Sequence, residues 1–319
     1  ERDHALLRQC GSLRVLTLSG SPLQRARVNG ELLRDGILSR DVVDYFSGKI
    51  GKVLQRQGFL ARWFGGFLYG QIVKGMMARS PGTLGQELTE MAAGMGVAPA
   101  TLQGAIVLPD LAAMINKYIN KEAMPAGGCT SVAWRDSQGG FVQGRNLDFG
   151  GVGSWDRHPL LVVSLPEEGS SELRHAAFSA DGIPFGGVTG VNEKGIAVAV
   201  HQNFSKDAGS NAGPMLFIGE LILRQANTLE DAVEILRQNR PGQLWTFILS
   251  DLRRGQVLAV FAAETVQAEL AQARAALAEA EAAAVDARGN AVRAREVRGT
   301  GALSEQQVAQ LLTAEQTAQ

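Results

Sequence analysis

Short apolar segments separated by glycine-containing turns fill the chain from Gly127 to about Ala263, and this pattern restricts the possible folds more than any other feature of the sequence. Such segments predict β-strands bounded by turns. Examples lie at 130–134, 160–164, 195–200, 245–249 and 256–261. One strong helix interrupts them, with Thr228 as the expected N-cap and Asp231 completing a capping box. Because strands and helices do not alternate strictly, the pattern favours an α+β layered fold over a doubly wound parallel sheet.

The residues before this region have a mainly helical pattern. A short alternating strand is expected at 13–18, and the tetrapeptide at 19–22 marks a turn after it. Apolar residues then recur at helical spacing in the segments 30–38, 42–54, 59–78, 84–95 and 99–118. We therefore expect a mainly helical N-terminal segment.

The composition changes again at Thr265. From there to Ala287 alanine, glutamate, glutamine and arginine predominate, which gives strong helix propensity with few large apolar side chains. A solvated helix is the plainer interpretation. The alternative is a helix that pairs in a coiled coil, for which the heptad pattern is short. A final helix is expected after Ser304, with Gln307 behind it as in a capping box. The chain is thus predicted to have three parts: 1–128, 129–264 and 265–319.

Charge and cysteine content narrow the function classes. With 31 Lys and Arg against 32 Asp and Glu, the net charge of −1 gives no global attraction to nucleic acid. Two cysteines, Cys10 and Cys129, cannot form a disulfide framework, and four scattered histidines argue against a zinc cluster. We therefore expect no cofactor, no metal and no nucleic-acid partner.

Two features bear on the compartment. The most apolar stretch, Phe59 to Ala78, is interrupted by Arg62 and Lys74, so we do not expect it to cross a bilayer. The chain starts at Glu1 rather than methionine, which slightly favours an exported or periplasmic protein over a cytoplasmic one.

A cysteine at the head of a predicted strand is the candidate nucleophile. Gly127 and Gly128 precede Cys129 and allow a strained backbone at the Gly128–Cys129 peptide bond. Arg145 and Asp148 follow one hairpin later, so the second strand can return a cation and a carboxylate to the thiol. The plainer interpretations are a small buried cysteine and an ordinary salt bridge between strands.

These segments resemble Ntn hydrolases of the cholylglycine hydrolase and penicillin V acylase superfamily, and within it the autoproteolytic acyl-coenzyme A:6-aminopenicillanic acid acyltransferase family. The family motif of a cysteine, then Thr-Ser, then Gly-Arg-Asn-Leu-Asp is met at 129–131 and 144–148. Two further blocks, 191–198 and 20–33, resemble other family segments. The resemblance spans residues 13–263 approximately. It implies a four-layer αββα sandwich with a mainly helical N-terminal propeptide or small subunit.

The resemblance also implies self-processing. Cys129 attacks the carbonyl of Gly128 in an N-to-S acyl shift, water releases the upstream segment, and the new α-amine of Cys129 serves as the base. Arg145 favours the thiolate by its charge, Asp148 orients the amine, and Asn203 helps to bind the oxyanion.

Three further residues are candidates for substrate or oxyanion contacts: Asn146, His201 and Arg293. The plainer interpretation of His201 is a packed or hydrogen-bonded histidine on a strand. A second oxyanion donor is not assigned, because residues 265–288 contain no asparagine where the family has one.

The resemblance predicts a self-processing N-terminal-cysteine amidohydrolase or acyltransferase that acts on a small amide through a thioester. Its partners would be a small-molecule amide or acyl donor, and either a second copy in a homodimer or its own two fragments in a processed heterodimer. The unassigned oxyanion donor motivates an alternative, a processed but catalytically weak binding or scaffold protein. A third interpretation is a lipid-amide hydrolase that uses the aromatic segment Phe59 to Tyr69 at a membrane surface. The plainer interpretation of these aromatic residues is core.

Overall fold

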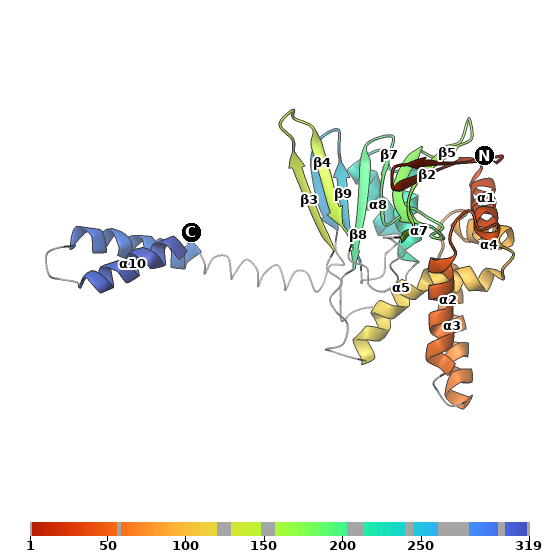
Figure 1. Ribbon diagram of the computed structural model, residues 1–319, viewed down its shortest axis with the longest axis horizontal. Helices are drawn as coiled ribbons and strands as arrows, with labels where there is room; N and C mark the ends of the chain where they lie inside the picture. Colours follow the sequence, from red (N-terminus) through yellow and green to blue (C-terminus); the bar gives the residue numbers. More distant parts are fainter. Residues whose placement is uncertain are drawn as a thin grey trace. The chain divides into compact units, whose positions relative to one another are not determined.

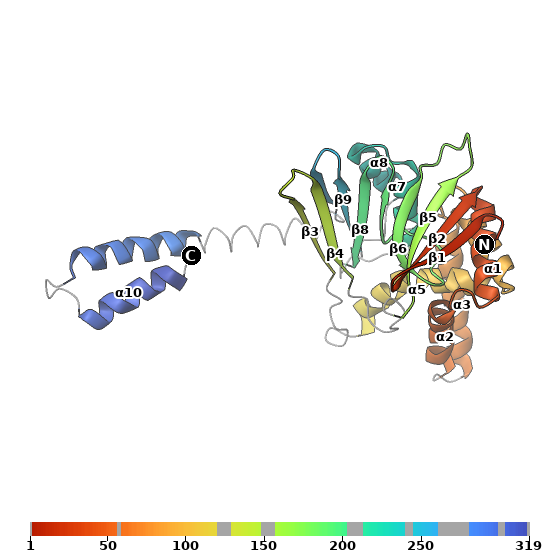
Figure 2. The same cartoon turned by 45° about the horizontal axis from the view of Figure 1, so that its top comes forward.

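The computed structural model describes residues 2–55, 59–119, 129–147, 157–202, 213–239, 245–260, 281–298 and 304–317. The chain divides into two compact units, Glu1–Ala262 and Ala263–Gln319. The first unit contains the described strands (Figure 1), and the second is helical where it is described (Figure 2).

An eight-stranded sheet forms the centre of the first unit. Its order is β1-β2-β5-β6-β7-β8-β9-β10. The bounds of these strands, in the same order, are Ala5–Cys10, Leu13–Gly20, Pro159–Pro166, His175–Ala180, Thr189–Asn192, Ile196–Gln202, Trp245–Asp251 and Gln256–Val260. Strands β2 and β5 pair in parallel, and the other neighbours pair antiparallel. Residues on both sides of Cys129 in the sequence therefore build one sheet.

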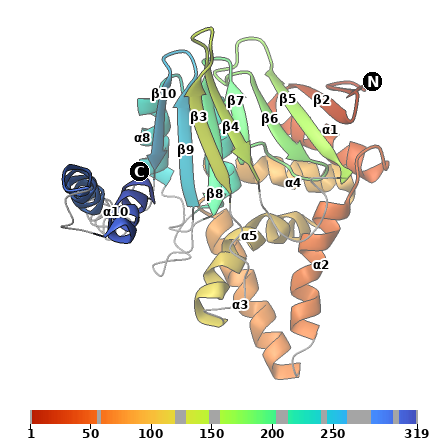
Figure 3. The ribbon, with the colours of Figure 1, turned by 60° about the vertical axis from the view of Figure 1, so that its left-hand side comes forward.

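A hairpin made of β3 (Thr130–Arg135) and β4 (Phe141–Asn146) forms a separate two-stranded sheet. Its turn is closed by Asp136, whose Oδ1 accepts a hydrogen bond from the backbone N–H of Gly140 at 2.7 Å. Figure 3 shows the hairpin in front of β8 and β9, with α8 behind the sheet. The hairpin expected after the candidate nucleophile is thus confirmed.

The described helices of the first unit are α1 (Pro22–Arg34), α2 (Asp41–Gln55), α3 (Phe59–Met77), α4 (Leu84–Met95), α5 (Pro99–Ile119), α7 (Met215–Gln225) and α8 (Leu229–Asn239). Helices α1 and α4 cross closely, and Gly94 permits this approach: a Cβ at this position would lie only 2.3 Å from the carbonyl oxygen of Arg27. Helix α7 contacts β7 and β8, and α8 contacts β9. Helices α2 and α3 lie side by side and extend away from the sheet (Figures 1 and 3).

The predicted α+β class is confirmed, with a large sheet and many helices that are compatible with an Ntn-type sandwich. The four-layer arrangement and the propeptide remain predictions. The expected strands and helices are found within a few residues of their predicted bounds, with one displaced start: α1 begins at Pro22 rather than near Gly30. Ser21 is its N-cap and forms a full capping box with Gln24, so the predicted turn is in fact a helix start.

Four elements were not predicted: β1, β6, β7 and α7. Strand β7 begins at Thr189, within a glycine-rich segment that predicts a turn. Helix α7 is buried from Met215 to Arg224, and its polar residues Glu220 and Arg224 pair with each other inside the fold instead of facing solvent. The expectation that a single helix interrupts the strands is therefore wrong.

The second unit contains a helix over 281–296 and α10 (Glu305–Thr317). The N-cap predicted at Ser304 is confirmed, because its Oγ accepts from the N–H of Gln307 at 3.2 Å and the Gln307 side chain accepts from its N–H at 2.9 Å. Ala291, Ala294 and Val308 are buried between the helices. Residues 265–280 of the predicted alanine-rich helix lie outside the described residues.

Candidate active site

Cys129 lies directly before β3 and is half-buried. Its Sγ accepts a hydrogen bond from Nη2 of Arg145 at 3.4 Å. Arg145 comes from the neighbouring strand β4, where the register sets it opposite Ser131. The predicted approach of a guanidinium to this thiol is therefore present in the structure, and it results from the hairpin.

The guanidinium of Arg145 also joins the hairpin to the large sheet. Nη1 donates to the carbonyl oxygen of Val188 at 2.9 Å and to Oγ1 of Thr189, and Nη2 donates to the carbonyl oxygen of Val200 at 2.5 Å. Burial lowers the pKa of Arg145, while the hydrogen bond and the charge of Cys129 raise it. The hydrogen bonds fix the guanidinium against the thiol.

His201 stands on β8, close to the same hairpin. Its Nε2 lies 2.7 Å from Oγ of Ser131, two residues after Cys129. Burial lowers the pKa of His201, and the positive charge of Arg145 lowers this pKa further. Both causes favour the uncharged imidazole, which can accept a hydrogen bond from the Ser131 hydroxyl. His201 is the hydrogen-bonded histidine that the plainer interpretation expected.

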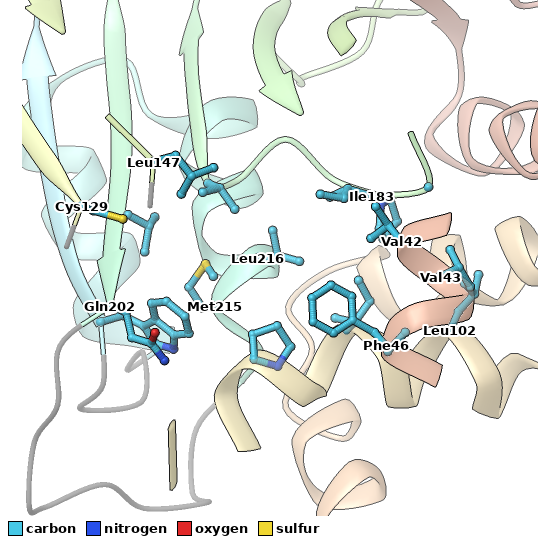
Figure 4. A pocket seen from close by; sticks show the side chains of 18 of the residues that line it. Val42, Val43, Phe46, Leu102, Cys129, Leu147, Ile183, Gln202, Met215 and Leu216 are labelled. Carbon is cyan, nitrogen blue, oxygen red and sulfur yellow. The ribbon is translucent and has the colours of Figure 1, made fainter. Parts of the chain in front are cut away.

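An apolar cavity of about 780 Å³, including its open mouth, extends from Cys129 into the first unit. Figure 4 shows Cys129 and Leu147 on one side of the cavity and Phe46 of α2 on the opposite side. Among the described residues that line it, Arg145 is the one that carries a charge, and most of the rest are aliphatic or aromatic. Such a cavity favours an uncharged, apolar group next to the thiol.

Both sides of the 128/129 bond contribute to the walls of this cavity. Helices α2 and α5 supply residues such as Val42 and Ile106, while α7 and β9 supply Met215 and Trp245. The residues before Cys129 are therefore part of the site.

Asp110 of α5 supports the inner wall of the cavity. Its Oδ1 accepts a hydrogen bond from Nε1 of Trp245 at 2.6 Å, and its Oδ2 accepts from the N–H of Met215 at 3.4 Å. Pro214, the N-cap of α7, offers no side-chain cap, so a carboxylate from α5 serves the start of this helix instead. Burial raises the pKa of Asp110 to about 7, against the lowering by its hydrogen bonds.

Sequence reasoning missed Asp110. The signal that could have found it is an isolated carboxylate directly after Pro109 in an otherwise apolar helical segment. A lone acid among apolar helical residues is seldom buried without partners.

Several predicted site residues are placed elsewhere or are not described. Gly128, Asp148 and Asn203 lie outside the described residues. Asn146 ends β4 opposite Thr130 and is exposed. The roles predicted for these residues stay predictions.

Arg293 belongs to the second unit, where its Nη2 donates to Oδ1 of Asn290 at 2.7 Å. Its predicted contact with substrate stays a prediction. Among the described residues, no group of three or more His, Cys, Asp or Glu side chains could hold a metal ion.

Residues 134–280 match a family of the Ntn hydrolase superfamily, a class that includes acyltransferase and amidase-type enzymes. The matching family model is described as acyl-coenzyme A:6-aminopenicillanic acid acyl-transferase. The resemblance drawn from the sequence motifs is thus confirmed. The matched residues include Arg145 and begin shortly after Cys129. No curated protein matches the chain.

Proposed function

We propose that the protein is a self-processing N-terminal-cysteine amidohydrolase or acyltransferase that acts on small amides with an apolar acyl group. The observation that carries this proposal is the 3.4 Å contact between Nη2 of Arg145 and Sγ of Cys129 at an apolar cavity. The family match supports acyl transfer as the reaction class. A nearby cation favours the thiolate, which is the reactive form of cysteine.

Processing comes first in this proposal. The thiol of Cys129 attacks the carbonyl carbon of Gly128, and the C–N bond breaks as the acyl group moves to sulfur. Water then hydrolyses the thioester, which leaves a carboxylate on Gly128 and a free α-amine on Cys129. That amine has an ordinary pKa of about 7.7–8.0, so it can accept the thiol proton without a histidine.

Turnover repeats the same chemistry on an amide substrate. The thiolate attacks the amide carbonyl, the amine leaves with a proton, and an acyl-cysteine thioester remains. Water or a second amine then attacks the thioester and returns the thiol. Hydrolysis and transfer share this intermediate and differ in the acceptor that reaches it. The apolar walls of the cavity support an acyl group without charge as the part that lies beside Cys129.

Buried ion pairs support retention of the N-terminal segment after processing. Arg224 of α7 donates to both carboxylate oxygens of Glu87 of α4, at 2.7 and 2.8 Å, and these groups are almost fully buried. Arg25 of α1 pairs with Glu172 in the same network. Since Arg25 and Glu87 precede the 128/129 bond while their partners follow it, the network joins the two expected fragments.

The mass of the purified protein tests the processing step. We expect two fragments, 1–128 and 129–319, with the larger one starting at Cys129. The variant Cys129→Ala should stay intact, and Cys10→Ser, which changes the other free cysteine, should process normally. An intact chain after prolonged incubation, or processing that survives in Cys129→Ala, would contradict the proposal.

The alternative function is a processed but catalytically weak binding or scaffold protein of the same fold. Its motivation is the unassigned second oxyanion donor. Titration with an N-acyl amide and with a cysteine-directed acylating probe separates the two functions. Labelling of Cys129 accompanied by turnover of the amide supports the enzyme, whereas labelling without turnover supports the scaffold.

A further inference from the structure

The segment that holds α2 and α3 differs in charge from the rest of the chain. Asp41 and Asp44 stand in the first turn of α2, and between residues 45 and 86 there is no further acidic residue, while the whole chain has a net charge of −1. The basic residues in this segment are Lys49, Lys52, Arg56, Arg62, Lys74 and Arg79. A local excess of positive charge of this size attracts an anionic surface even when the whole protein is near neutrality.

One face of α3 exposes large apolar side chains in the same segment. The exposed fractions are 65% for Trp63, 54% for Phe64, 52% for Phe67 and 43% for Leu68. The spacing of these four residues places them together on adjacent turns of the helix. The rings of Trp63 and Phe67 stack with centroids 6.3 Å apart. We call these four residues the aromatic face.

The other half of α3 is fixed in the fold. Val73 and Met76 are buried against Val107 and Leu111 of α5. The two helices α2 and α3 extend away from the sheet, so the aromatic face lies on a protruding part of the molecule (Figures 1 and 3). Monomeric soluble proteins seldom expose grouped large apolar side chains without a partner for them.

We infer that α2 and α3 form a docking element for the surface of an anionic lipid bilayer. Trp and Phe side chains partition into the boundary between headgroups and acyl chains, and Lys and Arg bind the anionic headgroups beside them. Among the described residues no helix is both long and apolar enough to cross a membrane, which agrees with a helix lying on the surface.

The docking element is continuous with the cavity beside Cys129. The first turns of α2 contribute Val42, Val43 and Phe46 to its lining. Docking would therefore bring the cavity close to amphiphilic substrates in the membrane. This consequence rests on the proposed function, whereas docking itself does not require turnover.

Cosedimentation of the full chain with vesicles tests the inference. We expect binding to vesicles of phosphatidylcholine mixed with phosphatidylglycerol, and a shift of the Trp63 emission to shorter wavelength. Replacing Trp63, Phe64 and Phe67 together with Ala should weaken binding by about tenfold or more, because buried apolar area drives interfacial binding. The control Trp134→Ala removes an aromatic ring that is 46% exposed on β3, and it should bind as the wild type does.

A second set of variants tests the charge. Lys49, Lys52 and Arg56 changed together to Gln should weaken binding and reduce its dependence on salt. The matched control changes three exposed arginines outside the segment to Gln: Arg174, Arg237 and Arg254. Equal losses in both sets would overturn the inference, since net charge alone would then explain the binding.

Two further outcomes would overturn the inference. One is vesicle binding by the triple alanine variant that equals that of Trp134→Ala. The other is a wild-type dimer in sedimentation velocity that the triple variant abolishes, without vesicle binding by either protein. The aromatic face would then be a contact between copies of the chain. Because these assays measure binding, their failure is separate from a failure of the proposed catalysis.

Discussion

Oδ1 of Asp110 accepts a hydrogen bond from Nε1 of Trp245 at 2.6 Å, so a carboxylate from α5 holds a side chain at the start of β9. Both residues are almost fully buried. The contact joins residues on opposite sides of the expected processing bond at the inner wall of the cavity. It also has a measurable consequence for stability.

We expect the protein to become less stable as the pH rises, because Asp110 loses a proton that the folded state holds. Burial raises the pKa of Asp110 to about 7 in the folded chain, whereas an unfolded Asp has a pKa near 3.9. The folded state therefore holds the proton more tightly, and this contribution is complete below about pH 4 and lost as the pH approaches 7. The loss is roughly 4 kcal/mol at about 1.36 kcal/mol per pKa unit.

Urea unfolding of the wild type and of Asp110→Asn at several pH values checks this expectation. The variant cannot ionise at this position. Its free energy of unfolding should therefore rise relative to that of the wild type between pH 4 and pH 7. Asp231→Asn is the matched control, because Asp231 accepts hydrogen bonds at the start of α8, away from the cavity. A constant difference between wild type and Asp110→Asn over this range would contradict the prediction.

Replacing Arg145 should slow alkylation of Cys129. The Nη2 of Arg145 lies 3.4 Å from Sγ, and its charge favours the thiolate that reacts with iodoacetamide. In a Cys10→Ser background, Arg145→Gln should lower the rate at neutral pH by about tenfold, and Arg145→Lys should lower it less. Arg135→Gln removes a cation from the same hairpin and should leave the rate unchanged. Similar rates in Arg145→Gln and Arg135→Gln would count against the role assigned to Arg145.

The same change should raise the pKa of His201. Burial and the positive charge of Arg145 hold this pKa below its usual range. Removing the charge in Arg145→Gln takes away the second cause, so the imidazole should titrate at higher pH than in the wild type. Titration of the imidazole resonances by NMR measures the shift, with His201→Gln to assign the signal. An unchanged pKa of His201 in Arg145→Gln would show that burial alone lowers this pKa.

Breaking the buried pair between Arg224 and Glu87 should destabilise the chain strongly. Each group is almost fully buried, and Glu87→Gln leaves a buried guanidinium with less compensation. The expected loss of unfolding free energy is about 1–3 kcal/mol, because Glu220 and Glu172 still compensate the guanidinium. The matched control Arg237→Gln breaks an exposed pair with Glu234, for which a change of about 1 kcal/mol or less is expected. Equal losses of unfolding free energy in urea titrations of Glu87→Gln and Arg237→Gln would contradict the stabilising role of the buried pair.

The parts that were predictable are those whose pattern is local. The helix start at Ser304 follows from a capping box of two residues, and the hairpin follows from turn residues between two short apolar segments. From the hairpin alone, Arg145 could be expected to approach Cys129. These features depend on residues that are close in sequence.

The parts that were not predictable depend on distant partners. Helix α7 has no solvent-exposed side to mark it, since it is buried from Met215 to Arg224 and its polar residues Glu220 and Arg224 pair inside the fold. The role of Asp110 arises from Trp245, which is 135 residues away. The pairing of Ser131 with His201 likewise depends on how the hairpin meets β8, and no local pattern contains that information.

The parallel pairing of β2 with β5 has a consequence for biogenesis. The register runs from Arg14 opposite Leu160 to Gly20 opposite Pro166, so the sheet cannot be completed by either half of the chain alone. Halves synthesised as separate polypeptides would each present an open strand edge, which favours aggregation. The proposed self-scission would accordingly have to follow assembly of the strands, and a gene split at that bond should give soluble protein only when both products are made together.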